Sequence, residues 1–497
     1  MKTQQFFEYH GIASNPFAEE DAQTDPVFKG HCIDSTYHPT WDKIYGDPAD
    51  PSTSIVFGEK GSGKTALRLQ IARHIEVYNR THPESQLFTI EYDDFNPFLD
   101  RFRERMASRQ SRADRMLTQW KLWDHMDAIL SLGVTSLIDG ILGTRSNAKA
   151  PANEITSSQV HLLDRHQARD LMLLAAYYDQ STAETFKGRW HRLRRRLKFR
   201  TWRSYLAPML GAIVTLTAAG LMIYLERWNW LERPWIYLIV LVGWLPWLAR
   251  SWQRLWQARF VARNVRVGKH SVSQLRQVLM RFAASDISGQ PAPDRQRTDD
   301  RYELLAKFQG ILKTLGYHGI IVLVDRVDEP HLINGSTDLM RALLWPMLDN
   351  KFLKHPGIGF KLLLPMELAQ FIDREDRDFY QRARLDKQNL IPSLEWTGEA
   401  LYDVASARIK ACAMPGSSPT LGELFEDSVS QRRLMDAFRG LRVPRHLFKF
   451  MYRLLVAHCN AHTDDAPSWR ISGERFESAL ALYSRDQDAF DRGLRAG

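Results

Sequence analysis

Cysteine is scarce in this chain, and its few copies are widely spaced. Three cysteines occur in 497 residues, Cys32, Cys412 and Cys459, and their separation does not match the spacing of metal ligands. The sequence therefore argues against a disulfide framework or a zinc site, and a reducing compartment is the simpler interpretation. Residues 1–17 contain no long apolar run, so no cleavable signal peptide is expected.

Acidic residues are missing from two stretches that are rich in basic ones. Residues 189–203 hold eight basic side chains and residues 250–269 hold six, with no acid in either block. Since the formal net charge of the whole chain is +9, the remainder is slightly acidic. Basic charge spread over a groove would suggest nucleic acid. Here the charge sits in two blocks, and the segment between them decides its meaning.

Two uncharged runs lie between the basic blocks. Residues 205–225 contain no charge, and neither do residues 234–249. The first run is long enough to cross roughly 30 Å of hydrocarbon. The second is shorter, but Arg250 can extend its charge to the interface. Because no charge occurs inside either run, the sequence gives no support for a transporter or a channel.

The flanks of the two runs predict their orientation. The turn at residues 226–233 carries two acids and two bases, whereas both outer flanks are strongly basic. This asymmetry predicts a transmembrane hairpin with both flanks in the cytoplasm, in contact with membrane lipids. Two alternatives stay open: a buried helical hairpin in a soluble protein, and a hairpin that lies in the membrane interface without crossing.

One segment has the sequence of a phosphate-binding loop. An apolar run at residues 54–57 precedes it, and a helical pattern follows at residues 66–78. In such a strand–loop–helix setting, backbone N–H groups and a helix N-terminus surround phosphate. We expect Lys64 to reach the β and γ phosphates of ATP, and Thr65 to bind Mg²⁺. The expected nucleotide-binding residues are Gly58, Glu59, Lys60, Gly61, Ser62, Gly63, Lys64 and Thr65.

A second motif predicts the other half of a metal site. Residues 319–324 read as a fully buried parallel strand that ends at Asp325. A carboxylate at the C-terminal edge of a parallel sheet is placed to hold Mg²⁺, which is the Walker B pattern. Further strands are expected at residues 87–92, 360–365 and 390–396.

Together these motifs resemble the KAP family of P-loop ATPases, related to the STAND and AAA+ groups. The resemblance covers residues 40–100 and 300–450, and it implies an ATPase core that is split by inserted membrane helices. It also implies a sensor role for Arg445 toward the γ-phosphate, because Arg445 follows Val443 and Pro444 at a helix start. Members of this family are membrane-tethered regulatory or signalling ATPases, so a homo-oligomer or a partner protein is expected.

The sequence departs from the family pattern beside Asp325. A second acid is usual at the next position, but Arg326 occupies it, and a guanidinium cannot accept a proton. The acid that activates water is therefore expected at Asp328 or Glu329, unless both merely begin the next turn. Arg382 or Arg384 could act as an arginine finger by position alone, with a surface salt bridge as the alternative.

We thus expect an α/β fold: a P-loop NTPase core with a parallel sheet, an inserted helical region with a transmembrane hairpin, and a C-terminal helical lid. The expected parts are a lead segment (1–40), the first part of the core (41–100), a helical insert (101–204), the hairpin (205–249), a juxtamembrane helix and linker (250–299), the second part of the core (300–397) and the lid (398–497).

The expected function is that of an ATPase with ATP and Mg²⁺ as cofactors. It would be a multi-pass protein of the cell (inner) membrane with its core in the cytoplasm, coupling ATP binding and hydrolysis to a conformational or signalling change. Arg326 motivates one alternative, a nucleotide-binding switch with little hydrolysis. Aromatic residues among the basic blocks motivate another, a membrane-tethered ATPase that handles nucleic acid. A non-enzymatic membrane scaffold is the third.

Overall fold

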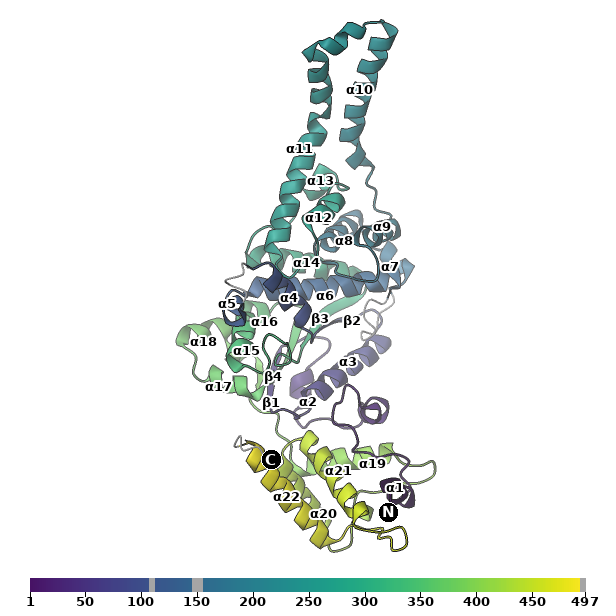
Figure 1. Ribbon diagram of the computed structural model, residues 1–497, viewed down its shortest axis with the longest axis vertical. Coiled ribbons are helices and arrows are strands. Elements are labelled where there is room, and N and C mark those ends of the chain that lie inside the picture. The colour runs from purple at the N-terminus through teal and green to yellow at the C-terminus, as the bar shows by residue number, and fades with distance from the viewer. Residues whose placement is uncertain (107–111, 145–154, 492–497) are drawn as a thin grey trace. The chain divides into compact units, whose positions relative to one another are not determined.

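The chain folds as an α/β protein around a five-stranded sheet in the order β2-β3-β4-β1-β5 (Figure 1). The computed structural model describes residues 1–106, 112–144 and 155–491. Strand β1 (Ser54–Gly58) lies between β4 (Ile358–Pro365) and β5 (Asn389–Ile391) and is parallel to both. The other strands are β2 (Gln86–Tyr92) and β3 (Tyr317–Val324). The expected α/β class and parallel sheet are confirmed.

The central strands are buried on both faces, as expected for a parallel sheet. Every residue of β1 and β4 is buried, which explains their continuous apolar sequences. The prediction of a strand over residues 390–396 is wrong beyond Ile391, where β5 ends. Beyond the strand, Trp396 donates its indole N–H to the carbonyl of Ser62 at 2.8 Å.

Two compact units share the chain. The first comprises residues 1–82, 323–329 and 349–497, and the second comprises residues 83–322 and 330–348. Helices of the first unit are α1 (Thr3–Tyr9), α2 (Trp41–Tyr45), α3 (Lys64–Thr81), α16 (Asn350–Leu353), α17 (Ala369–Ile372), α18 (Arg377–Ala383), α19 (Gly398–Ala411), α20 (Gln431–Leu441), α21 (Pro444–Asn460) and α22 (Gly473–Asp491). Those of the second are α4 (Asn96–Glu104), α5 (Ala113–Leu117), α6 (Leu122–Leu142), α7 (Ser157–His161), α8 (Arg165–Tyr178), α9 (Phe186–Arg196), α10 (Leu206–Tyr224), α11 (Pro234–Asn264), α12 (Val272–Leu279), α13 (Ala284–Ile287), α14 (Thr298–Thr314) and α15 (Thr337–Leu344).

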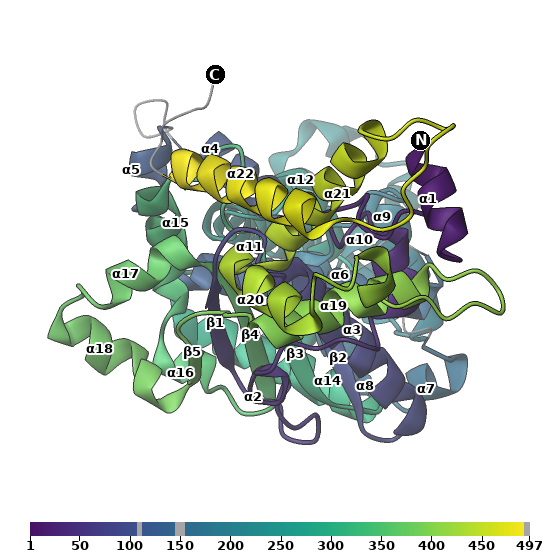
Figure 2. The ribbon, with the colours of Figure 1, turned by 90° about the horizontal axis from the view of Figure 1, so that it is seen from below.

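The N-terminal segment belongs to the core of the C-terminal helices. Phe6, Phe7 and Phe17 are buried in one apolar cluster with residues of α19, α20 and α21, and Figure 2 shows α1 beside these helices. The buried Arg408 of α19 donates to the carbonyl of Pro16 at 2.6 Å and pairs with Asp25. Residues from the two ends of the sequence therefore build one helical subdomain.

Helix α6 is apolar enough to resemble a membrane span but lies inside the second unit. Its mean hydropathy is 1.3, and 78% of its most apolar window is buried. Three aspartates on α6 form buried or nearly buried ion pairs with arginines that flank the hairpin. These pairs are Asp124–Arg266, Asp127–Arg301 and Asp139–Arg189. Since buried carboxylates require paired cations, the ion pairs fix α6 as an interior helix.

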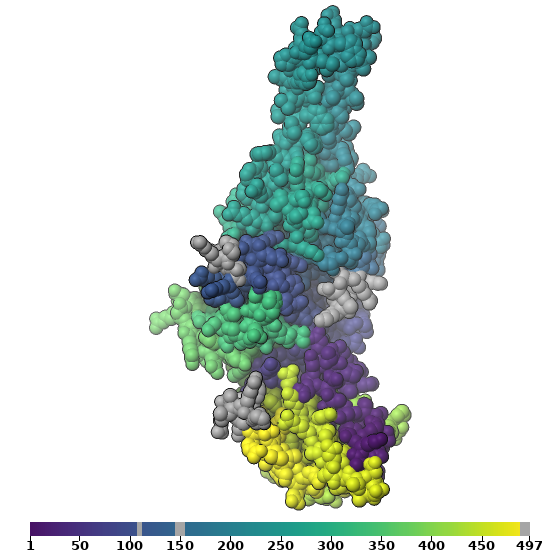
Figure 3. Space-filling view, in the orientation of Figure 1, coloured from purple at the N-terminus to yellow at the C-terminus, as the bar shows by residue number. Residues whose placement is uncertain are grey.

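Helices α10 and α11 lie side by side as a hairpin (Figure 1). Only 6% and 17% of their most apolar windows are buried, and Figure 3 shows the outer part of the hairpin exposed. With α6, they are the three helices of the described residues that are long and apolar enough to span a membrane. Helix α11 continues past the expected end at residue 249 because residues 250–264 keep contacts with α12.

Candidate functional site

The glycine-rich loop, residues 58–65, joins the end of β1 to the start of α3. Gly61 and Gly63 have φ angles of 90° and 94°, a region that other residues rarely adopt. At Gly58, a Cβ atom would lie 2.4 Å from Ser62 Oγ, so the loop folds back closely on the strand end. Three glycines therefore make this tight turn possible directly before a helix N-terminus.

Lys64 folds over this loop. Its Nζ donates to the carbonyls of Gly58 at 2.7 Å and Glu59 at 3.0 Å. Burial lowers the pKa of Lys64, while the carboxylates of Asp325, Asp328 and Glu367 raise it. The ammonium group is thus held at the loop with carboxylates around it.

Thr65 and Asp325 meet at the base of the loop. Thr65 Oγ1 donates to Asp325 Oδ2 at 3.1 Å, although 260 positions separate the two residues. Asp325 is 1% exposed, and the guanidinium of the buried Arg68 lies 3.3 Å from the same carboxylate. Burial raises the pKa of Asp325, whereas Arg68 and the Thr65 hydroxyl lower it. A hydroxyl and a carboxylate oxygen side by side are ligands that suit Mg²⁺.

The acidic turn, residues 325–329, carries three carboxylates with different surroundings. Arg326 has a φ angle of 60°, and its Nε lies 3.3 Å from Glu329 Oε1. The Glu329 side chain is 55% exposed, whereas Asp328 is half-buried and acts on the charge of Lys64. Of the two acids expected to activate water, Asp328 is therefore the one whose charge acts on Lys64 of the loop.

Arg445 contacts the glycine-rich loop through its backbone. Its N–H donates to the carbonyl of Gly61 at 3.3 Å, and a Cβ on Gly61 would lie 2.6 Å from Arg445 Cβ. Proline at the first position of α21 and the extended Val443 before it start this helix at the loop. The arginine that the sequence singles out thus lies on the first turn of α21, against the loop.

Two residues at the loop escaped the sequence analysis. Trp396 donates to Ser62 O, and its ring meets the ring of His38 edge-on at 4.8 Å. Glu367 follows β4, whose last residue Pro365 lies beside Gly58 in the sheet register, and its charge acts on Lys64. Glu367 could have been predicted as a site residue, because it follows a parallel strand. Nothing in the local sequence marks Trp396 as one.

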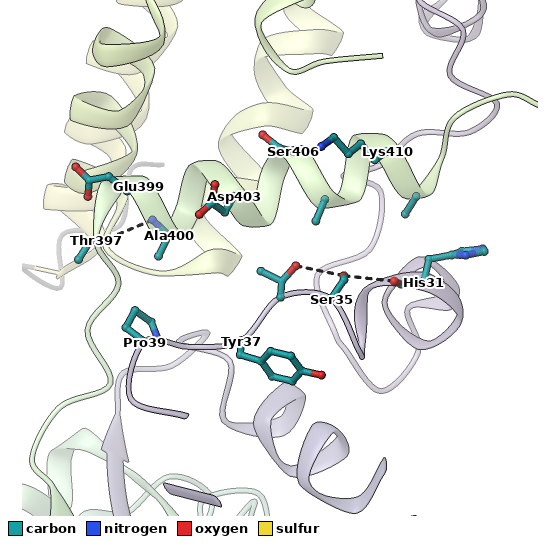
Figure 4. Close-up of a pocket in the computed structure, with 13 residues that line it drawn as sticks. His31, Ser35, Tyr37, Pro39, Thr397, Glu399, Ala400, Asp403, Ser406 and Lys410 are labelled. Atoms are coloured by element: carbon teal, nitrogen blue, oxygen red, sulfur yellow. Dashed lines mark hydrogen bonds between the residues drawn. The ribbon is translucent and has the colours of Figure 1, made fainter. Parts of the chain in front are cut away.

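A pocket of about 800 Å³ opens next to Trp396 (Figure 4). One wall is α19, with Thr397, Asp403 and Lys410, and the other is the segment of Ser35, Tyr37 and Pro39. Thr397 begins this wall by capping α19, since its Oγ1 accepts from Ala400 N at 3.1 Å. Carboxylate, hydroxyl and ammonium groups therefore alternate with apolar surface along the pocket.

The two arginines considered as an arginine finger contact side chains of their own segment. Arg384 Nε lies 3.5 Å from Asp386 Oδ1, which fits the alternative of a surface salt bridge. The guanidinium of Arg382 lies over the ring of Phe379, 5.8 Å from its centroid. Both residues belong to the end of α18.

No family model, no curated protein and no solved structure matches the chain. Among the described residues, no group of three or more His, Cys, Asp or Glu side chains could hold a metal ion. A Mg²⁺ ion needs no such group, because it commonly keeps waters and takes one or two protein ligands together with substrate phosphates. Thr65 and Asp325 are therefore a hydroxyl and a carboxylate in the number and chemistry of such protein ligands.

Proposed function

We propose that this protein is a membrane-anchored P-loop ATPase that couples ATP binding and hydrolysis to a conformational or signalling change at the cytoplasmic face of the inner membrane. The observation that carries the proposal is the hydrogen bond between Thr65 and Asp325 at the glycine-rich loop. Two residues far apart in sequence are paired there with the chemistry that a P-loop and a Walker B strand require.

In this proposal, the residues of the glycine-rich loop, the acidic turn and α21 have separate roles. Backbone N–H groups of the loop bind phosphate oxygens, and Lys64 exchanges the carbonyls of Gly58 and Glu59 for the β and γ phosphates. Thr65 and Asp325 would hold Mg²⁺, which supplies charge neutralisation at the phosphates when bound. Asp328 orients the attacking water as a base. Arg445, on the first turn of α21, reports the γ-phosphate to the C-terminal helices.

The pocket beside Trp396 is the best candidate for the nucleotide base. It starts one residue after Trp396, whose indole is bonded to the loop. Its volume of about 800 Å³ falls within the usual range for small-molecule sites, roughly 300–1,000 Å³. Ala400→Trp would place an indole in this space, so it should weaken ATP binding without altering the loop.

ATP turnover by the full chain in detergent tests the proposal. Asp325→Asn should bind Mg²⁺–ATP weakly and lower turnover by at least ~10²-fold, in the range for loss of one strong electrostatic contribution. Asp373→Asn, which removes an exposed carboxylate at the end of α17, is the matched control and should match the wild type. Absence of any Mg²⁺-dependent turnover or ATP binding in the wild type would refute an ATPase.

A second candidate is a nucleotide-binding switch that hydrolyses little. The ion pair between Arg326 and Glu329 favours it. Glu329 is one of the two acids that could activate water, and the pair would hold its carboxylate away from that role. In this case the wild-type protein binds ATP and ADP but hydrolyses almost no ATP, and Arg326→Ala raises the rate of ATP hydrolysis. An unchanged low rate of hydrolysis in Arg326→Ala would show that the ion pair between Arg326 and Glu329 does not restrain hydrolysis.

A further inference from the structure

The base of the hairpin is rich in cations and poor in acids. Between residues 186 and 285 the only acidic residues are Glu226 and Glu232, and both lie in the turn at the far tip of the hairpin. At the opposite end, α11 and α12 contribute several arginines, and α12 and α13 lie beside the lower part of α11 (Figure 1). The next acid along the chain is Asp286 of α13, and its charge acts on both Arg250 and Arg254.

Arg250 and Arg281 mark the level at which the two apolar helices leave the second unit. Arg250 donates to Ser204 O at 2.9 Å, just before α10, and to Met280 O at 3.1 Å, just after α12. Arg281 donates to the hydroxyl of Tyr205. The two guanidinium groups therefore tie both helices together at one depth, next to the first exposed apolar turns.

Arg254 is the unusual member of this group. It lies one turn further along α11 and is only 4% exposed. Its guanidinium donates to the side chain of Gln257, its Nε has no hydrogen-bond partner, and no described carboxylate forms an ion pair with it. The charge of Asp286 acts on Arg254 without forming an ion pair with it. Because a buried guanidinium that is not paired is unfavourable, an anion from outside the chain would relieve it.

Exposed aromatic side chains surround the same level. Trp202, Trp252 and Trp256 are 58%, 63% and 41% exposed. Tryptophan is typical of the boundary between lipid headgroups and hydrocarbon. This combination, with cations inside and tryptophans outside, matches the depth of a lipid phosphate.

We infer that Arg254, together with Arg250 and Arg281, forms a binding site for the phosphate of an anionic phospholipid headgroup at the base of the hairpin. The inference rests on the membrane insertion in the proposed function and does not depend on ATP turnover. Basic pockets beside membrane helices on the cytoplasmic side bind such headgroups. The lipid phosphate would accept hydrogen bonds from the guanidinium groups, and its acyl chains would lie along α10 and α11.

Lipid binding by the full chain in a neutral maltoside detergent tests this site. Native mass spectrometry and thermal unfolding are measured with phosphatidylglycerol, phosphatidylcholine or inorganic phosphate added separately. We expect phosphatidylglycerol to bind about 5-fold or more tightly than phosphatidylcholine, and Arg254→Gln to lose about 5-fold, as for one basic residue near an anionic surface. Without lipid, Arg254→Gln should unfold at a higher temperature than the wild type, because it removes a buried unbalanced charge.

Arg259→Gln is the matched control, since Arg259 is exposed on the same helix. It removes the same charge and should keep the lipid preference, and Arg281→Gln should reproduce the loss if Arg254→Gln does not fold. Equal loss in Arg254→Gln and Arg259→Gln would mean general attraction to an anionic surface and would overturn the site. Stabilisation by inorganic phosphate alone, or tighter binding of a short DNA duplex than of phosphatidylglycerol, would also overturn the lipid assignment.

Discussion

Gly61 and Arg445 are in direct contact: the backbone N–H of Arg445 donates to the carbonyl of Gly61 at 3.3 Å. The approach is close enough that a Cβ atom on Gly61 would lie 2.6 Å from Arg445 Cβ. The glycine-rich loop is therefore in direct contact with the first turn of α21, with no room there for a side chain on Gly61. Any movement of the loop upon nucleotide binding must move, or be opposed by, the C-terminal helices.

Gly61→Ala should disrupt this contact. Gly61 has a φ angle of 90°, and strain of this kind costs about 1–3 kcal/mol, with the clash against Arg445 in addition. We expect a lower free energy of unfolding and weaker ATP binding, measured by denaturant titration and nucleotide titration. Gly440→Ala in α20, where no atom lies within 4 Å of the added Cβ, should stabilise by about 0.5–1 kcal/mol instead. Similar effects for both variants would contradict the contact.

Lys64→Ala should abolish ATP binding while leaving the fold intact. The Lys64 ammonium bonds only loop carbonyls, so its loss removes phosphate contacts rather than core packing. Nucleotide titration and the thermal unfolding temperature separate these effects. Lys60→Ala removes an exposed side chain of the same loop but keeps the backbone N–H expected to bind phosphate, so it serves as the control with near-normal affinity. Unchanged ATP affinity in Lys64→Ala would rule out the phosphate-loop assignment.

Variants of the three carboxylates Asp328, Glu329 and Glu367 should differ in their rate of ATP hydrolysis. Asp328→Asn should bind ATP normally but hydrolyse it ~10²-fold more slowly, as expected for a lost general base. Glu329→Gln should change the rate little, because Glu329 already pairs with Arg326 at 3.3 Å. Steady-state turnover at saturating ATP measures both. If Asp328→Asn keeps full activity and Glu367→Gln loses it, Glu367 is the base and the assignment to the acidic turn is wrong.

The hairpin should place its turn and its base on opposite sides of the membrane. Cysteines introduced at the exposed Asn229 and Ser285 should react with an impermeant thiol reagent from the periplasmic and the cytoplasmic side, respectively. Background labelling should be low, because Cys32, Cys412 and Cys459 are all buried. Labelling of both positions from the cytoplasmic side would indicate a hairpin that does not cross.

The pair formed by Asp127 and Arg301 should dominate the stability of the second unit. Both side chains are 0% exposed, with Nη2 and Oδ2 3.0 Å apart, and Tyr178 donates to the same carboxylate at 2.7 Å. Asp127→Asn leaves the guanidinium unbalanced and should cost about 3–5 kcal/mol of unfolding free energy. Replacing both partners, Asp127→Leu with Arg301→Met, should recover most of that loss. An additive double variant would show that the two residues do not act as a pair.

The sequence predicted those helices and strands that are encoded by a continuous apolar run. The apolar run 205–225 became α10 (Leu206–Tyr224), and the strand ending before Asp325 became β3 (Tyr317–Val324). Strand 390–396 was overextended, because the apolar pattern does not reveal that Trp396 bonds a residue 334 positions away. The ion pairs of the α6 aspartates were missed for the same reason: Arg189, Arg266 and Arg301 lie far from them along the chain, and periodicity carries no information on such pairing.

The ion pairs of α6 set an order for making the protein. Asp124 and Asp127 leave the ribosome before the hairpin, whereas Arg266 and Arg301 leave it afterwards, and chains emerge from the N-terminus. Until both apolar helices have been synthesised, these carboxylates lack their cations and α6 cannot settle in the interior. The second unit therefore completes its core only after the hairpin has been synthesised.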